Sequence, residues 1–293
     1  MRLRSKHSST APTAPAAPQY PPRTSGDTAH GRHGSVAGAV AGAAVELRSV
    51  RRTYGRGDST VHALRGIDLA LPRGSFTAVM GPSGSGKSTF LQCAAGLDKP
   101  TTGTVHLGGA DITGLSENKL TQLRRSRIGF IFQSFNLLPS LTVQQNVMLP
   151  QRLAGARPDR RRAAELLAQV GLEGYGKRRP GQLSGGQQQR VAIARALVTA
   201  PEVVFADEPT GALDTNTARE VLGLLRHAVD RLGATVVMVT HDPVAASFAD
   251  RVLFLADGSL AGHLERPEPT EIADHMVALT TGTRPERVAR AAA

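Results

Sequence analysis

The sequence of 293 residues contains little cysteine, few aromatic side chains and no long apolar segment. Its single cysteine, Cys93, excludes an internal disulfide bond and a cysteine-based metal cluster, which indicates a reducing compartment. No segment approaches the about 20 consecutive apolar residues that a membrane-spanning helix requires. The best candidate, residues 36–45, is short and consists mostly of glycine and alanine. A role at a membrane would therefore require a membrane-embedded partner.

Basic residues outnumber acidic ones, with 35 lysines and arginines against 24 aspartates and glutamates. They collect in the N-terminal segment, at residues 157–162 and 177–179, and near the C-terminus, with few aromatic residues between them to stack on bases. This distribution favours solvated faces or contact with anionic lipid headgroups over specific binding of nucleic acid. The basic N-terminus lacks the apolar segment of a secretory signal, so we expect the protein to remain in the cytosol.

Three regions differ in composition along the chain. Residues 1–43 are predicted to form a disordered leader, because five prolines among serine, alanine and glycine leave no periodic apolar face to bury. Residues 44–264 carry the regular apolar patterns of a folded domain. Residues 265–293 form a C-terminal tail with only weak patterning.

Short apolar runs alternate with helical patterns in the central region. Two runs, residues 45–54 and 61–71, predict strands of an antiparallel layer. Three continuous apolar runs predict buried parallel strands at residues 76–80, 203–206 and 235–240. A helix follows Ser184 and stops before Pro201, and another covers residues 215–232 and ends at Gly233. Strands that alternate with helices predict an α/β fold with a mainly parallel sheet.

A phosphate-binding P-loop pattern lies between a predicted strand and a predicted helix. It consists of Gly81, Pro82, Ser83, Gly84, Ser85, Gly86, Lys87, Ser88 and Thr89. Glycines let the backbone curl, so that successive N–H groups and the helix N-terminus face a phosphate. Lys87 would neutralise the β- and γ-phosphates, and the Ser88 hydroxyl would bind Mg²⁺. A merely flexible Gly/Ser loop would not be expected to carry Lys-Ser at this offset.

Two acids end the apolar run at residues 203–206, where a parallel sheet presents residues to its ligand. Asp207 is suited to the Mg²⁺ shell, directly or through water. Glu208 is suited to the role of a general base that polarises the attacking water. Taken alone, the pair could equally cap a strand; together with the P-loop, it predicts nucleotide hydrolysis.

Residues 183–190 read Leu-Ser-Gly-Gly-Gln-Gln-Gln-Arg and resemble the signature that distinguishes ABC ATPases from other P-loop proteins. The resemblance extends over about residues 45–263, with the motifs in the family's order. It implies the ABC ATPase fold, a P-loop NTPase core with an N-terminal antiparallel β layer and a helical subdomain at about 134–190. It also implies that Ser184, Gly185 and Gly186 contact the γ-phosphate of ATP held by a second subunit. A helix N-terminus is a ready anion site, which agrees with that role.

Four further positions match the family one at a time. Tyr54 resembles the aromatic residue on which adenine stacks, although a surface tyrosine at a strand end is the alternative. Gln133 resembles the glutamine that senses Mg²⁺ and the attacking water, and Asp214 lies in a segment like the loop that crosses the dimer interface. His241 resembles the histidine that holds the γ-phosphate, although a histidine at the end of a buried strand is more often structural. The implied cofactors are ATP and Mg²⁺, with Ser88, Gln133 and Asp207 as metal-binding residues.

Residues 61–67, 129–138 and 187–190 are similar to the branch that contains macrolide exporters, lipoprotein-releasing ATPases and antimicrobial-peptide exporters. The resemblance implies a peripheral ATPase on the cytoplasmic face of the membrane. It would form a homodimer that sandwiches two ATP molecules and powers export or mechanical work by a separate transmembrane permease. A groove near Gln133 would receive a short cytoplasmic helix of that permease, consistent with the apolar segment 135–149.

Two alternative functions remain open at this point. The first is an ABC ATPase that regulates an envelope enzyme without transport. The second is a soluble ABC ATPase that acts on nucleic acid. Proteins of the second kind usually need a second cassette or a long coiled-coil insertion in the same chain, and the sequence contains neither.

Overall fold

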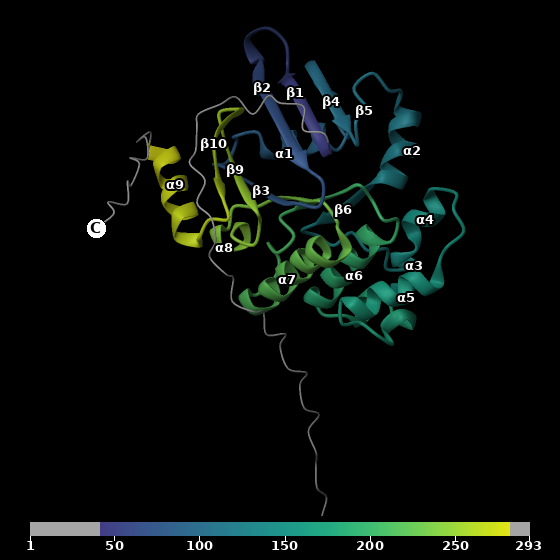
Figure 1. Ribbon diagram of the computed structural model, residues 1–293. Coiled ribbons are helices and arrows are strands. Elements are labelled where there is room, and N and C mark those ends of the chain that lie inside the picture. The colour runs from purple at the N-terminus through teal and green to yellow at the C-terminus, as the bar shows by residue number, and fades with distance from the viewer. Residues whose placement is uncertain (1–41, 282–293) are drawn as a thin grey trace, which may run out of the picture. The chain divides into compact units, whose positions relative to one another are not determined.

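A four-stranded antiparallel sheet forms the N-terminal part of the structure, a computed structural model that describes residues 42–281. Most of the predicted leader (1–43) and the last part of the predicted tail (265–293) lie outside these residues. The strand order is β2-β1-β4-β5 (Figure 1). The strands are β1 Ala43–Tyr54, β2 Val61–Pro72, β4 Thr102–Leu107 and β5 Ala110–Asp111. The predicted antiparallel layer is therefore confirmed.

A second sheet has six strands in the order β10-β9-β3-β8-β7-β6. Five of them run parallel to their neighbours, and β10 runs antiparallel to β9 at one edge. The strands are β3 Phe76–Met80, β6 Ile128–Phe132, β7 Val203–Asp207, β8 Val236–Val239, β9 Arg251–Ala256 and β10 Ser259–Glu265. All residues of β3 and β8 are buried, because the sheet is covered on both faces. The predicted α/β fold with a mainly parallel sheet is confirmed.

Helices connect these strands and cover the sheet. They are α1 Lys87–Ala94, α2 Glu117–Arg127, α3 Val143–Val147, α4 Leu149–Leu153, α5 Arg160–Gln169, α6 Gly185–Leu197, α7 Thr215–Leu232, α8 Pro243–Ala246 and α9 Pro269–Thr281. Three short 3₁₀ turns add η1 Gly57–Ser59, η2 Tyr175–Lys177 and η3 Pro180–Gln182. Local signals set the bounds of α7: the Asp214 carboxylate accepts from two backbone N–H groups of its first turn, and Gly233 ends it with a φ of 66°. None of the described helices is long and apolar enough to span a membrane.

The hydrophobic core has two parts, one on each face of the six-stranded sheet. Alternate residues of β3 separate them, since Phe76 and Met80 belong to one part and Val79 to the other. The part around Val79 lies between the two sheets and includes Phe90 of α1. The part around Phe76 is formed with the helices α5 to α9 (Figure 1). Packing on both faces therefore fixes the position of the strands from which the functional loops extend.

Helix α9 lies within the segment that the sequence analysis describes as a weakly patterned tail. Its Ile272 side chain is fully buried in the core. The ring of His275 lies 4.2 Å from the ring of Phe254 on β9, measured between centroids. Burial lowers the pKa of His275, so the neutral ring is favoured in this contact. The helix thus packs on the domain through Ile272, and Met276 and Leu279, at helical spacing from it, are partly buried against the same core.

We expect Ile272→Ala to lower the free energy of unfolding by about 2 to 5 kcal/mol, because it removes a buried side chain and leaves a cavity. Val277→Ala is the matched control on the same helix, since Val277 is 60% exposed, and it should change stability by less than about 0.5 kcal/mol. Urea denaturation of the two variants measures the difference. Equal small effects at both positions would mean that α9 does not pack on the core.

Candidate functional site

The predicted functional residues meet because the strands that carry them are parallel. The P-loop follows β3, Asp207 ends β7, His241 follows β8 and Gln133 follows β6. Strands β3, β8, β7 and β6 are consecutive neighbours in the sheet, so their carboxyl ends lie at one edge. Ligands of open parallel sheets bind at this edge. Segments more than 100 residues apart in the sequence are thereby brought to one place.

Two glycines of the P-loop allow a close approach to neighbouring backbone. A Cβ atom on Gly81 would lie 2.1 Å from the carbonyl oxygen of Leu255, and one on Gly86 would lie 2.4 Å from that of Ala63. Both glycines also have positive φ angles, 152° and 99°. Because no side chain fits, the loop curls tightly against β2 and β9 and delivers its N–H groups to the start of α1 at Lys87.

The ammonium group of Lys87 lies within the P-loop. Its Nζ donates to the carbonyl oxygens of Gly81 and Pro82, at 2.8 Å each. Burial lowers the pKa of Lys87, while the negative charges of Glu208 and Asp207 act in the opposite direction. The structure therefore places the lysine of the P-loop within electrostatic reach of both acids at the end of β7.

Asp207 and Glu208 differ in their surroundings although they are adjacent. Burial raises the pKa of Asp207, and the Glu208 carboxylate raises it further, while Lys87 opposes the shift. Glu208 has a φ of 45°, and its N–H donates to the Val239 carbonyl at 2.9 Å. This left-handed conformation is strained for a residue other than glycine, and strain of this kind concentrates at functional sites.

His241 lies beside Glu208. Its Nδ1 is 3.0 Å from Oε1 of Glu208, a hydrogen-bonding distance, and its side chain is 69% exposed. A buried structural histidine would not be exposed in this way, so the position argues against the purely structural alternative. The carboxylate and the imidazole can together orient a water molecule and a phosphate oxygen.

The signature segment begins helix α6 and packs on helix α7. Ser184 caps α6: its Oγ accepts from the N–H of Gln187, whose side chain accepts from the N–H of Ser184 in return. A Cβ atom on Gly186 would lie 2.2 Å from Cγ2 of Thr217 in the first turn of α7. The glycine therefore lets the N-termini of α6 and α7 approach each other. The side chain of Asp214 holds the first turn of α7 at this contact.

Gln133 and Tyr54 lie at different ends of the site. A Cβ atom on Gly211 would lie 2.7 Å from Nε2 of Gln133, which places this amide against the segment that leads to Asp214. Tyr54 ends β1 in the other sheet. Its hydroxyl donates to Asp98 at 2.7 Å, and the Arg52 guanidinium lies 4.4 Å from its ring centroid. These contacts do not test whether adenine stacks on Tyr54, so that role stays a prediction.

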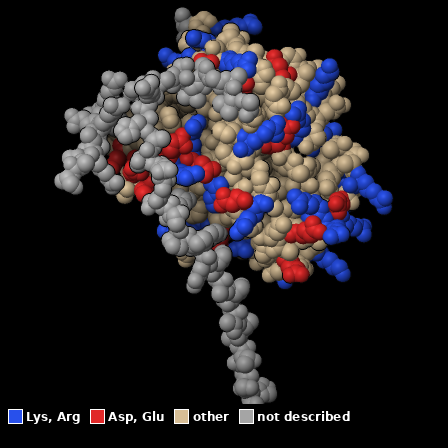
Figure 2. All heavy atoms as spheres, in the orientation of Figure 1, with Lys and Arg blue, Asp and Glu red and all other residues tan. Residues whose placement is uncertain are grey.

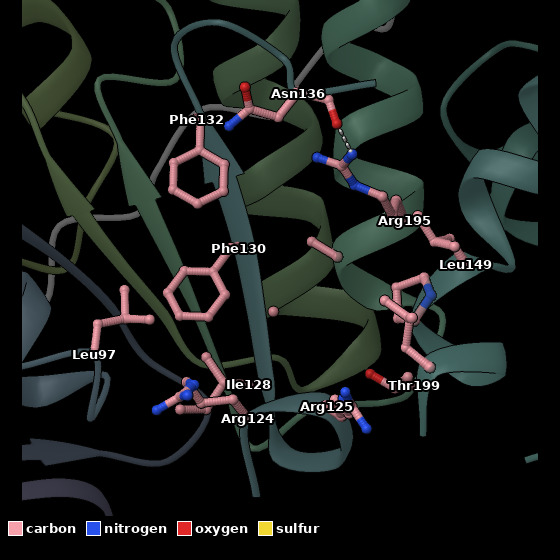
Figure 3. Close-up of a pocket in the computed structure, with 14 residues that line it drawn as sticks. Leu97, Arg124, Arg125, Ile128, Phe130, Phe132, Asn136, Leu149, Arg195 and Thr199 are labelled. Carbon is pink, nitrogen blue, oxygen red and sulfur yellow. Dashed lines mark hydrogen bonds between the residues drawn. The ribbon is translucent and has the colours of Figure 1, made fainter. Parts of the chain in front are cut away.

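A groove of about 350 Å³ lies beside the end of β6 (Figure 3). Phe130 and Phe132 of β6 stack with ring centroids 5.8 Å apart, and with Leu97 and Leu149 they form its apolar lining. Arginines from α2 and α6 border it, including Arg195, which donates to the Asn136 and Phe135 carbonyls at 2.5 and 2.8 Å.

The sequence predicts a groove near Gln133 that receives a short helix, consistent with the apolar segment 135–149. That segment supplies only Asn136 and Leu149 to the lining. The remaining lining residues come from β6, α2, α4, α6, Thr199 just after α6 and the loop that carries Leu97. Two of the lining residues are exposed apolar side chains, since Leu97 is 48% and Leu153 52% exposed. Their convergence requires the tertiary structure.

Comparison with known proteins gives a consistent result. The family described as ABC transporter matches residues 64–211. An uncharacterized ABC transporter ATP-binding protein of Methanocaldococcus jannaschii, MJ0796, is 46% identical over 222 residues, which are 74% of this chain and 94% of that protein. A dimeric structure of the MJ0796 cassette in a post-hydrolysis state, bound to ADP and Pi, matches with a TM-score of 0.69 and 44% identity. That match extends over 76% of this chain and 99% of the other.

Larger relatives also match. The macrolide export ATP-binding/permease protein MacB of Escherichia coli K12 is 46% identical over 243 residues, which are 82% of this chain but 36% of MacB. MacB of Marinobacter nauticus is 47% identical over 218 residues, which are 74% of this chain and 34% of that protein. The matched region thus makes up little more than a third of the MacB relatives, and it contains the P-loop, both acids and the signature. The chain belongs to the ABC transporter family and has the fold of its ABC ATPases.

Proposed function

We propose that this ABC ATPase hydrolyses ATP as a homodimer and thereby drives a separate membrane permease in export or mechanical work. The observation that carries the proposal is the convergence of Lys87, Asp207, Glu208 and His241 at the carboxyl edge of one parallel sheet. A phosphate-binding lysine, a carboxylate suited to metal, a base and a phosphate ligand are the groups that phosphoryl transfer to water requires.

The P-loop is suited to the phosphates of ATP. The N–H groups at the start of α1 provide an anion site, and the Lys87 ammonium would exchange its two carbonyl partners for phosphate oxygens. The exposed Ser88 hydroxyl, the Gln133 amide oxygen and the Asp207 carboxylate are hard oxygen donors, a set that fits Mg²⁺. The metal, when bound, would neutralise charge that develops on the phosphates.

Glu208 is the proposed general base. Its strained backbone and the neighbouring imidazole of His241 fix the carboxylate at the edge of the sheet. The carboxylate would accept a proton from the attacking water, and His241 would hold a γ-phosphate oxygen. These groups act on the developing charge only when water and phosphate lie between them, which a closed dimer would ensure.

The homodimer is proposed from the position of the signature. Ser184 caps the N-terminus of α6 and is exposed. Ser184 and the first N–H groups of α6 would contact the γ-phosphate of the ATP held by the partner subunit, so that two ATP molecules lie between two chains. Support comes from the MJ0796 cassette, whose structure is described as dimeric and as bound to ADP and Pi. Hydrolysis would remove the γ-phosphate from this contact and allow the dimer to open.

The groove beside β6 is the proposed docking site for a short cytoplasmic helix of the permease. Its apolar lining suits the apolar face of a helix, and the bordering arginines suit an acidic residue on that helix. MacB is named for both an ATP-binding and a permease function, which supports a membrane partner for this chain. The protein would then lie at the cytoplasmic face of the membrane. Basic and acidic side chains are interspersed on the face shown in Figure 2, which gives no support to a nucleic-acid surface.

Glu208→Gln should lower ATP hydrolysis by about 10² or more, because it removes the charge that accepts the proton of water while keeping the shape of the side chain. ATP binding should persist, and an ATP-bound dimer should accumulate. Phosphate release and size-exclusion chromatography measure the two effects. Glu165→Gln, a change at a surface ion pair on α5, is the control and should hydrolyse ATP normally. Normal turnover by Glu208→Gln would exclude the proposed base.

Ser184→Arg should abolish the ATP-dependent dimer in the Glu208→Gln background, because a bulky side chain would block the contact with the partner's phosphate. Binding of ATP to the isolated chain should stay intact, since Ser184 is proposed to contact only the partner's nucleotide. Ser116→Arg changes the N-cap of α2 in the same way and should leave the dimer unaffected. Weaker ATP binding by the Ser184→Arg monomer would instead place the signature and the P-loop on the same nucleotide.

Leu153→Glu should disrupt binding to the permease while leaving ATP hydrolysis by the isolated subunit unchanged, because a charge in the apolar groove opposes a docked helix. Val277→Glu is the control, since Val277 is an exposed apolar residue on α9, outside the groove. Co-purification with a co-expressed permease measures the effect. Equal recovery of the permease with both variants would exclude the groove as the docking site.

A further inference from the structure

The Gln189 side chain is completely buried on the inner face of the signature helix α6. Its Nε2 donates to the carbonyl oxygen of Pro209 at 2.5 Å. Pro209 directly follows Glu208, so a polar side chain of the signature helix holds the residue next to the proposed base. Burial of an amide group costs free energy unless a hydrogen bond offsets it. Here the Pro209 carbonyl is the hydrogen-bond partner of the buried amide.

The turn that Gln189 contacts is the strained one. Glu208 has a φ of 45°, and a residue before proline is restricted further by the proline ring. Such a conformation persists only where its surroundings determine it. The Glu208 N–H donates to the Val239 carbonyl at 2.9 Å, and the Glu208 carbonyl accepts from the N–H of Gly211 at 3.0 Å.

The bond from Gln189 completes this set. Val239 holds the turn from β8, Gly211 holds it from the following loop, and Gln189 holds it from α6. Pro209 has no N–H group, so its carbonyl is the next backbone group after Glu208 through which the turn can be fixed. Without the Gln189 amide, this buried carbonyl would lack its donor, and the turn could relax toward an unstrained φ.

We propose that Gln189 is a positioning residue for ATP hydrolysis, which holds the Glu208–Pro209 turn so that the Glu208 carboxylate points toward the attacking water. The inference rests on the proposed function, in which Glu208 is the base. Because its side chain is completely buried, Gln189 is not proposed to touch the nucleotide or the attacking water. Gln189 would act through the backbone of the turn. A displacement of about 1 Å in a catalytic group can lower the rate by about 10², so a small shift of the turn is enough to slow hydrolysis. Gln189 also connects the signature to the turn of the proposed base, since it lies on α6 and Ser184 caps that helix.

Gln189→Met in the full chain tests this role, because methionine has a similar shape and volume but no donor. We expect kcat for ATP hydrolysis to fall by about tenfold or more, with little change in the KM for ATP. Thr235→Val is the matched control. It removes another hydrogen bond made by a buried side chain, from the Gly74 N–H to Thr235 Oγ1 at 3.0 Å, at the amino end of β8. This variant should lose similar thermal stability and keep its kcat.

A double-mutant comparison separates positioning from other effects. If Gln189 acts only through Glu208, adding Gln189→Met to Glu208→Gln should leave the residual hydrolysis of Glu208→Gln unchanged. The ATP-dependent dimer of Glu208→Gln should also still form. If Gln189→Met does not give folded protein, Gln189→Asn, which withdraws the amide by one methylene group, should show the same fall in kcat.

Two outcomes would overturn the inference. In the first, Gln189→Met lowers kcat no more than Thr235→Val does. In the second, it lowers the residual activity of Glu208→Gln by the same factor as it lowers that of the unmodified chain. Normal hydrolysis by the Glu208→Gln variant alone would contradict the proposed function instead, so the two failures are distinguished by that single variant.

Discussion

The parallel alignment of β3, β8, β7 and β6 is the constraint on which the rest of the structure depends. Because the strands point the same way, each ends at the same edge of the sheet and adds one functional segment there. Burial on both faces keeps the strands in fixed register, so the segments that follow them have little freedom. In the described six-stranded sheet, the antiparallel neighbour is β10 at the edge, and none of the predicted catalytic residues follows it.

Charges at this edge are held close together and partly out of water. Burial acts on Lys87 and Asp207 in opposite senses, lowering the pKa of one and raising that of the other, and their mutual attraction opposes both shifts. Lys87 can attract a phosphate, and the two carboxylates, whose combined charge exceeds that of Lys87, can attract a cation. These charges are the electrostatic basis for proposing that a nucleotide and Mg²⁺ bind here together.

Helix α6 connects the parts of the molecule that would have to move together. Its N-terminus carries Ser184, and its buried face reaches Pro209 through Gln189. Near its C-terminus, Arg195 holds the carbonyls of Phe135 and Asn136, just beyond Gln133 and beside the groove. Helix α6 thus contacts the turn that follows the proposed base and borders the proposed permease surface, and its N-terminus carries the signature.

The sequence by itself determined the fold class and the identity of the chemical groups, because these depend on local patterns. Continuous apolar runs predicted the parallel strands, and the offset of Lys87 from the P-loop glycines predicted a phosphate site. Helix α9 was not predicted, although its apolar residues Ile272, Met276 and Leu279 have helical spacing and pack on the core. Only the tertiary structure decided which groups meet: the strain at Glu208, the contact of Gln189 with Pro209 and the groove lined from several elements all depend on residues far apart in the chain. Contacts of this kind follow from packing between elements, which no local pattern in the sequence specifies.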